Sequence, residues 1–286
     1  MTYSSNFIDV KGTRLHYLHW QSGGPPVLFI HGNTHCGGVY APLAEKLAPE
    51  FSVVALDLRG HGQSDKPGPY SWAALRDDAA GLIDALGLDD LLIVCHSRGG
   101  GVGLLAAAAR ADSVRGVVAY EPNVPLQHWH VESAEERTAQ LMERAKRRRD
   151  SFPSREEMYK HFKGRGAFKD WQDEYLRAYV EHGSLDAADG TVTFASPTSV
   201  EALFYGETFN LEEWNKIHDC AVPVLAIFGE DGGRVISGQD PVAALRTIFK
   251  TVDLKVLPHS THSGPMEHPG EFEQMIRDFA ATLPLD

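Results

Sequence analysis

Three kinds of residue in this sequence could carry out nucleophilic chemistry together: a serine, a histidine and a carboxylate. The apolar run Leu91–Cys95 leads into His96-Ser97-Arg98-Gly99-Gly100, and a segment of small residues follows. This order predicts a buried strand that turns into a helix and holds Ser97 at the turn. A histidine near the serine could take its proton close to neutral pH and return it to a leaving group, and an acid could orient that histidine.

The segment around Ser97 resembles the nucleophile elbow, G-x-S-x-G, of the α/β-hydrolase superfamily. In that turn, small residues two positions before and after the serine let the strand and the helix approach closely. Gly99 matches the second glycine, whereas Cys95 stands at the first, and a cysteine is small enough to be tolerated there. The segment 57–64 also matches the family's D-x-R-G-x-G-x-S turn, which is mostly structural.

The segment Leu28-Phe-Ile-His-Gly-Asn-Thr34 is similar to the family's His-Gly oxyanion loop. An acyl-transfer transition state develops negative charge on the carbonyl oxygen, and two preorganised N–H groups stabilise it. The resemblance implies that these are the backbone amides of Asn33 and Arg98. The Asn33 side chain is a further possible donor.

The general base is expected in the segment His259–Pro269, which follows an apolar run ending at Leu257. This segment is similar to the family's G-H-x-x-x-x-E-x-P loop, with Thr261 in place of the glycine. The register of Glu267-His-Pro269 selects His262, and His259 is the competing candidate.

Two carboxylates compete for the role of the acid that orients the histidine. Most relatives place an aspartate in a G-x-x-D loop after the lid, but here Gly232 stands at that position and Asp231 comes one residue early. A second family pattern, found in some haloalkane dehalogenases and in zearalenone-type lactonases, places the acid after the strand that precedes the lid. There this chain has Glu121, which we favour over Asp231.

These residues need a scaffold, and the sequence predicts a parallel sheet with helices on both faces. Short runs that are apolar throughout indicate strands covered on both sides, and longer helical patterns alternate with them. The N-terminal segment 6–20 alternates and predicts an antiparallel hairpin. The expected strands are 27–30, 51–56, 91–95, 116–120, 222–228 and 252–257, and the expected helices are 38–48, 71–87, 98–110, 238–249 and 270–283.

The chain between the fourth and fifth expected strands differs in composition. It has charged helical segments and no convincing buried strand. Capping-box patterns at Ser133 and Ser154 and a helix stop at Gly183 predict a helical lid. We expect an α/β-hydrolase core at 1–121 and 218–286 with a lid at 122–217. The basic run 146–149 is interpreted as a solvated helix end. Trp129, Trp171 and Trp214 are candidate substrate contacts.

Composition limits the function classes further. Hydrophobic residues make up 43% and charged residues 23%, which excludes wholesale disorder, and the net charge of −12 argues against non-specific nucleic-acid binding. The most apolar stretch, 102–109, is too short to span a membrane, and the three cysteines form no disulfide pattern. We expect a cytoplasmic protein without nucleic-acid or membrane partners, and monomer and homodimer remain open.

The combined pattern predicts a serine hydrolase that needs no cofactor or metal. We expect it to cleave a carboxylic ester or lactone through an acyl-enzyme, and its small-molecule substrate to be apolar or aromatic. The alternatives are a C–C bond hydrolase with the same triad, a ligand-binding protein without activity and a cofactor-free oxygenase on this fold. The pair His31 and His35 has the spacing of helical metal ligands, but His31 ends a strand. His128 and His130 are interpreted as lid-surface residues.

Overall fold

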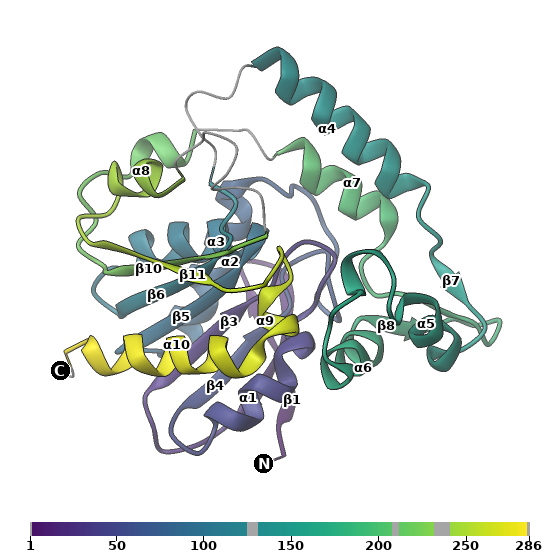
Figure 1. Ribbon diagram of the computed structural model, residues 1–286, viewed down its shortest axis with the longest axis horizontal. Coiled ribbons are helices and arrows are strands. Elements are labelled where there is room, and N and C mark those ends of the chain that lie inside the picture. The colour runs from purple at the N-terminus through teal and green to yellow at the C-terminus, as the bar shows by residue number, and fades with distance from the viewer. Residues whose placement is uncertain (1, 125–130, 208–211, 232–240, 285–286) are drawn as a thin grey trace.

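A central sheet of eight strands organises the computed structural model, which describes residues 2–124, 131–207, 212–231 and 241–284. The strand order is β1-β2-β4-β3-β5-β6-β10-β11, and all pairs are parallel except β1–β2 and β2–β4 (Figure 1). The strands are β1 Ser4–Val10, β2 Thr13–Trp20, β3 Pro26–Ile30, β4 Ser52–Leu56, β5 Leu91–His96, β6 Val114–Tyr120, β10 Val224–Gly229 and β11 Val252–Leu257. The predicted antiparallel hairpin and the six further predicted strands are all present, but β11 is an edge strand whose four central residues are exposed, so the expectation that it is covered on both sides was wrong.

Helices cover both faces of this sheet, which explains the continuously apolar strands. In β3, Leu28 and Ile30 belong to one apolar cluster, whereas Val27 and Phe29 belong to the other, and all four are fully buried. The first cluster includes residues of α2 Trp72–Leu86, α3 Ser97–Ala109 and α8 Pro241–Arg246. The second includes residues of α1 Ala41–Leu47 and α10 Pro269–Thr282. The fold is the predicted α/β-hydrolase fold.

The chain between β6 and β10, which we call the insert, lies outside the large sheet (Figure 1). It contains helices, as predicted, and also a small antiparallel sheet in the order β7-β9-β8, which the sequence did not indicate. Its strands have only two or three residues, too few for a visible periodicity. The elements are α4 Val131–Lys146, β7 Ser151–Phe152, α5 Arg155–Phe162, α6 Asp173–His182, β8 Ser184–Asp186, β9 Val192–Phe194 and α7 Thr198–Gly206.

One of the two predicted capping boxes marks a helix start. The Ser154 hydroxyl accepts a hydrogen bond from the Glu157 amide at 3.2 Å, at the N-terminus of α5. Ser133 instead lies inside α4, so the boundary predicted there was wrong. Gly183 follows the last residue of α6, as expected.

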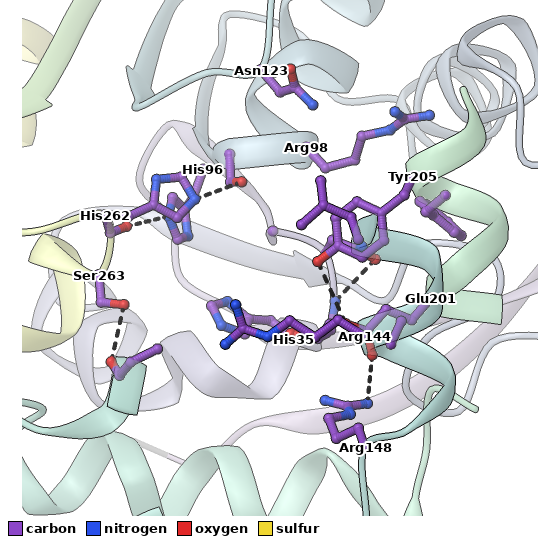
Figure 2. A pocket seen from close by; sticks show the side chains of 18 of the residues that line it. His35, His96, Arg98, Asn123, Arg144, Arg148, Glu201, Tyr205, His262 and Ser263 are labelled. Carbon is purple, nitrogen blue, oxygen red and sulfur yellow. Dashed lines mark hydrogen bonds and ion pairs between the residues drawn. The ribbon is translucent and has the colours of Figure 1, made fainter. Parts of the chain in front are cut away.

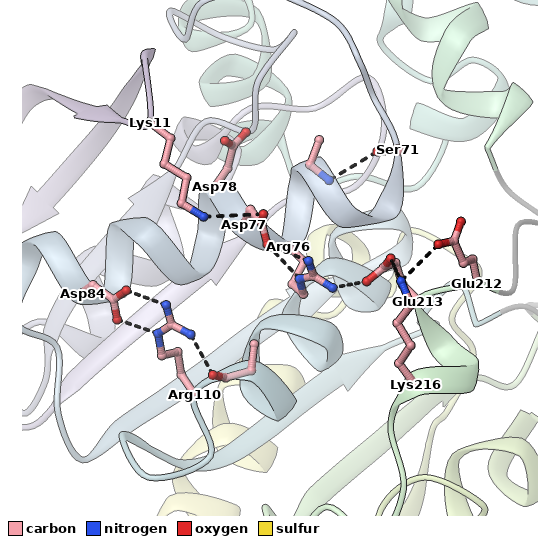
Figure 3. A network of polar contacts seen from close by, with 12 residues as sticks. Lys11, Ser71, Arg76, Asp77, Asp78, Asp84, Arg110, Glu212, Glu213 and Lys216 are labelled. Carbon is pink, nitrogen blue, oxygen red and sulfur yellow. Dashed lines mark hydrogen bonds and ion pairs between the residues drawn. The ribbon is translucent and has the colours of Figure 1, made fainter.

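Ion pairs fasten the end of the insert to α2 (Figure 3). Arg76 bonds to Asp77 on its own helix and to Glu213 beside the short helix Trp214–Lys216. Lys216 bonds back to Glu213 at 2.6 Å. Because Glu213 is buried, this contact fixes where the chain re-enters the large sheet.

Close packing between β5 and α3 shapes the turn at Ser97. A Cβ on Gly99 would lie 2.2 Å from the carbonyl oxygen of His31, so only glycine fits there. A Cβ on Gly103 would lie 2.8 Å from Sγ of Cys95. The cysteine therefore occupies space that Gly103 leaves open one turn further along α3.

This packing predicts a strong coupling between Cys95 and Gly103. We expect Gly103→Ala to lower the free energy of unfolding by about 1–2 kcal/mol, because overpacking costs about 1–3 kcal/mol and alanine in a helix regains up to about 1 kcal/mol. In a Cys95→Gly background the same change should be neutral or stabilising. Urea unfolding of the four proteins measures both effects, and equal effects in the two backgrounds would contradict this packing.

Candidate active site

Ser97 occupies a strained turn between β5 and α3. Its φ is +55°, in the left-handed region that non-glycine residues avoid. Such a conformation costs about 1–3 kcal/mol and persists only where its surroundings fix it. Here the amide of Asn123 donates to the Ser97 carbonyl at 2.7 Å. The turn therefore holds the serine at the carboxyl end of the sheet.

His262 reaches Ser97 from the loop between β11 and the short helix α9 Gly264–Glu267. Its Nε2 lies 2.9 Å from Ser97 Oγ, which is hydrogen-bonding distance. The imidazole side chain is 44% exposed, so it also faces the open space in front of the serine.

Glu121 lies directly beneath this histidine, at the carboxyl end of β6. One carboxylate oxygen is 3.0 Å from His262 Nδ1, and the other accepts a hydrogen bond from the Gly229 amide at 3.1 Å. The side chain is fully buried, and the residue has a φ of +43°. Both ring nitrogens of His262 thus have partners, with the acid on one side and the serine on the other.

The competing candidates lie elsewhere. Asp231 is exposed, and its amide donates to the Ser260 carbonyl. His259 is 87% exposed on its side chain and lies 3.5 Å from Glu230 in an ion pair. Neither takes part in the contacts between Ser97 and His262.

The loop that carries His262 is held by residues that the motif comparison did not assign. The Tyr120 hydroxyl donates to the Thr261 carbonyl at 2.6 Å. Nε2 of His96 lies 2.8 Å from the carbonyl oxygen of His262. Glu267 accepts hydrogen bonds from the Thr261 amide and hydroxyl at 2.8 and 2.6 Å. Tyr120 and His96 directly precede Glu121 and Ser97, and this adjacency is the sequence signal that could have identified them.

The loop after β3 passes directly in front of the serine. A Cβ on Gly32 would lie 3.2 Å from Cβ of Ser97, so the next residue, Asn33, is close to the reacting position. Oδ1 of Asn33 accepts a hydrogen bond from the Thr34 amide at 3.2 Å. Arg98 is the second residue of α3, so its amide is among those without an acceptor inside the helix.

The side chain of Arg98 is buried against aromatic rings. Its guanidinium carbon lies 3.7 Å from the centre of the Trp72 ring, and Nη2 donates to the Tyr70 carbonyl at 3.3 Å. Nε and Nη1 are buried without a hydrogen-bond partner. Burial lowers the pKa of this arginine to about 9, because a charged group loses its hydration.

A cavity of about 1120 Å³ opens in front of Ser97 and His262 (Figure 2). The loop 32–35 and the turn 96–98 form one wall, and α4, α7 and the segment 167–171 of the insert form the others. Its lining residues include Trp171, which is 8% exposed and packs edge-on against His35.

The other two predicted tryptophan contacts do not belong to the described lining. Trp214 packs edge-on against Trp72 in the apolar cluster, with ring centres 5.6 Å apart, so assigning it to the substrate was wrong. Trp129 lies outside the described residues, as do His128 and His130.

Within the described ranges, no three His, Cys, Asp or Glu side chains are grouped as a metal site requires. The ring nitrogens of His31 are engaged by the Gly32 carbonyl and the Leu58 amide, at 2.8 and 3.0 Å. Nor does any helix in those ranges combine the length and apolar character of a bilayer span.

Comparison with known proteins settles the family. Residues 27–275 match the model of the alpha/beta hydrolase family. The chain belongs to this family. This alpha/beta hydrolase has Gly232, outside the described residues, where the common pattern has an acid. In the structure, Glu121 is the carboxylate next to His262.

The curated relatives of this alpha/beta hydrolase match only in part. A segment of 102 residues is 42% identical to the 2-(acetamidomethylene)succinate hydrolase of Mesorhizobium japonicum, covering 35% of this chain and 37% of that protein. A segment of 113 residues is 40% identical to lipase LipV of Mycobacterium tuberculosis, covering 39% of this chain and 43% of that protein. The matches thus span less than half the length of either relative.

Solved structures match over nearly the whole chain. The crystal structure of E-2-(acetamidomethylene)succinate hydrolase aligns with a TM-score of 0.83 and 25% identity, covering 98% of this chain and 100% of that one. A thioesterase domain from the curacin biosynthetic pathway aligns with a TM-score of 0.76 and 20% identity, covering 97% of this chain and 100% of that one. The second likeness shows a shared fold alone.

The geometry predicts different outcomes for two carboxylate substitutions. We expect Glu121→Gln to lower kcat by about 10³–10⁴-fold, because an amide keeps the size of the side chain but cannot stabilise a charged imidazole. Asp231→Asn is the matched control and should retain nearly full activity. Steady-state kinetics with a p-nitrophenyl ester, and urea unfolding to check the fold, measure this. Loss of activity in Asp231→Asn, with activity retained in Glu121→Gln, would contradict the assignment.

Proposed function

We propose that this alpha/beta hydrolase is a serine hydrolase that cleaves a carboxylic ester or lactone through an acyl-enzyme on Ser97. One observation carries the proposal: the contacts from Ser97 Oγ to His262 Nε2 and from His262 Nδ1 to Glu121 measure 2.9 and 3.0 Å. A nucleophile, a base and an orienting acid in this order form the constellation that acyl transfer requires.

In the first half of the reaction, His262 Nε2 takes the proton of the Ser97 hydroxyl as Oγ attacks the substrate carbonyl. Glu121 holds Nδ1–H of the ring and stabilises its positive charge. As the tetrahedral intermediate collapses, His262 gives the proton to the leaving oxygen. The alcohol departs, or stays tethered if the substrate is a lactone, and the acyl group remains on Ser97.

In the second half, a water molecule replaces the alcohol. His262 takes a proton from the water, and the resulting hydroxide attacks the acyl carbonyl. The second tetrahedral intermediate releases the carboxylic acid and returns the proton to Ser97. The open face of the half-exposed imidazole supports this role, because water needs access to Nε2.

The backbone amides of Asn33 and Arg98 are the oxyanion donors in this proposal. Loss of one such donor costs about 2.7–4 kcal/mol of transition-state stabilisation in a serine protease. The placement of Gly32 against Ser97 and of Arg98 in the first turn of α3 supports the assignment.

We assign residues 122–217 the role of a lid over the core formed by 1–121 and 218–286. Support comes from the cavity, since α4, α7 and Trp171 of the insert line it together with Ser97. The aromatic lining at Phe168, Trp171 and Phe204 favours a substrate with an apolar or aromatic part.

A second candidate function is hydrolysis of an amide-type bond with the same residues. The names of the succinate hydrolase relative and of the matching solved structure favour it, because both denote substrates with an acetamido group. A C–C bond hydrolase would use the same triad. A ligand-binding protein without activity is disfavoured, because Ser97, His262 and Glu121 are all present and in contact.

The nucleophile is tested by covalent labelling. We expect a fluorophosphonate to modify Ser97, located by peptide mass spectrometry, because His262 activates that hydroxyl. Ser97→Ala should abolish both labelling and turnover of p-nitrophenyl esters while the protein stays folded. Full turnover by Ser97→Ala would refute the proposal, whereas labelling without turnover of esters, lactones or amides would favour a binding protein.

The lid is tested by two tryptophan substitutions with different expected effects. Trp171→Ala should change the preference among esters of different acyl length more than reactivity toward p-nitrophenyl acetate, because Trp171 lines the cavity. Trp214→Ala is the matched control, and it should lower stability without changing that preference, because Trp214 packs against Trp72. Unchanged chain-length preference in Trp171→Ala would count against the lid assignment.

A further inference from the structure

The cavity lining carries an excess of positive charge, although the protein has a net charge of −12. Two carboxylates, Glu143 and Glu201, face the cavity among its described residues. Glu143 is paired with Lys146 at 3.0 Å, and Glu201 with Arg148 at 3.0 Å. The lining cations are Arg98, Arg144, Arg147 and Arg148. Arginines therefore outnumber carboxylates in the wall that faces the substrate.

Three of these arginines have no ion pair among the described residues: Arg98, Arg144 and Arg147. His35 adds no positive charge, because burial, together with His31, His262 and Arg148, lowers its pKa to about 3. Arg144 and Arg147 are exposed, and Arg98 is buried, with Glu207 near enough to offset part of the lowering of its pKa by burial. The lining as a whole therefore keeps an excess of positive charge that attracts a negatively charged ligand.

Arg144 and Arg148 are the two cations best placed to act together. Arg144 lies in the last turn of α4, which ends at Lys146, and Arg148 follows two residues after that end; both line the cavity. Figure 2 shows both on the side of Tyr205 opposite to Arg98. Glu201 fixes Arg148 at one edge of its guanidinium, and Arg144 is exposed.

The surroundings of this pair define the rest of the ligand. Phe168, Trp171 and Phe204 are apolar residues that line the same cavity as the arginines and Ser97. A ligand that satisfies both features has a short hydrocarbon part and a carboxylate at one end. Arginine binds carboxylates through paired N–H donors.

We propose that the substrate carries a free carboxylate in addition to the bond that is cleaved, and that Arg144 and Arg148 bind it. The inference rests on the proposed function for the cleaved bond, but the binding of the carboxylate is independent of that chemistry. A carboxylate is favoured over a phosphate, because Glu201 already neutralises part of the charge of Arg148 and a single negative charge then balances the pair.

The test compares glutarate with its neutral diamide, glutaramide, as inhibitors of p-nitrophenyl acetate hydrolysis by the full chain. We expect the inhibition constant of glutarate to be at least about tenfold lower than that of glutaramide, and to rise with salt. Arg144→Gln and Arg148→Gln should each remove most of this preference. Arg144 is exposed, so its variant should fold even if Arg148→Gln destabilises the protein by removing the ion-pair partner of the buried Glu201.

Arg149→Gln is the matched control, because Arg149 is exposed, donates to the Ser151 carbonyl and is absent from the described cavity lining. It should keep the preference for glutarate. Equal inhibition by glutarate and glutaramide in a wild type whose turnover depends on Ser97 would overturn the carboxylate site and leave the proposed function intact. Stronger inhibition by inorganic phosphate than by glutarate would also overturn it.

A wild type without ester turnover would instead count against the proposed ester hydrolysis. The carboxylate site is then decided by calorimetric titration of the two compounds, in which preferential binding of glutarate supports it and equal binding refutes it.

Discussion

The hydrogen bond between the buried carboxylate of Glu121 and His262 is the interaction on which the rest of the site depends. A fully buried carboxylate must find partners, because burial removes its hydration. Glu121 has the Gly229 amide on one oxygen and His262 on the other. These two contacts set the direction of the imidazole and thereby the position from which Nε2 meets Ser97. The same carboxylate links β6, β10 and the histidine loop.

The parallel sheet makes this contact possible. Ser97, Glu121 and His262 follow β5, β6 and β11, and the carboxyl ends of parallel strands meet at one edge of a sheet. Strained backbone at Ser97 and Glu121 is held by hydrogen bonds from Asn123 and to Ile227. Core packing at Gly99 fixes the angle of α3 behind the serine. The site is therefore positioned by the central sheet, whereas the insert supplies other walls of the cavity.

Local sequence patterns predicted the strands of the large sheet and the turn that carries Ser97. Buried strands are visible as apolar runs such as Leu91–Cys95, and motifs with special backbone needs, such as Ser97-Arg-Gly99, identify turns. The choice of Glu121 followed from a family pattern that places the acid after the strand preceding the lid, and the structure puts Glu121 beside His262, while its catalytic role stays a prediction.

Other features depend on contacts between distant segments, which no local pattern reveals. The two- and three-residue strands of the insert fall in this group. So does Trp214, whose partner Trp72 lies in another helix. The basic run 146–149 has the composition of a solvated helix end, but Arg147 and Arg148 line the cavity. The adjacency of Tyr120 and His96 to Glu121 and Ser97 marks them as residues near the site, but the loop that they hold follows β11 and is distant in sequence.

The central claim is that Glu121, and no other acid, holds the Nδ1 proton of His262. Proton NMR of the enzyme phosphonylated at Ser97 tests it most directly, because a proton shared with a buried carboxylate resonates far downfield. The account predicts such a resonance in the wild type and in Asp231→Asn, and its loss in Glu121→Gln. A downfield resonance that persists in Glu121→Gln and disappears in Asp231→Asn would contradict it.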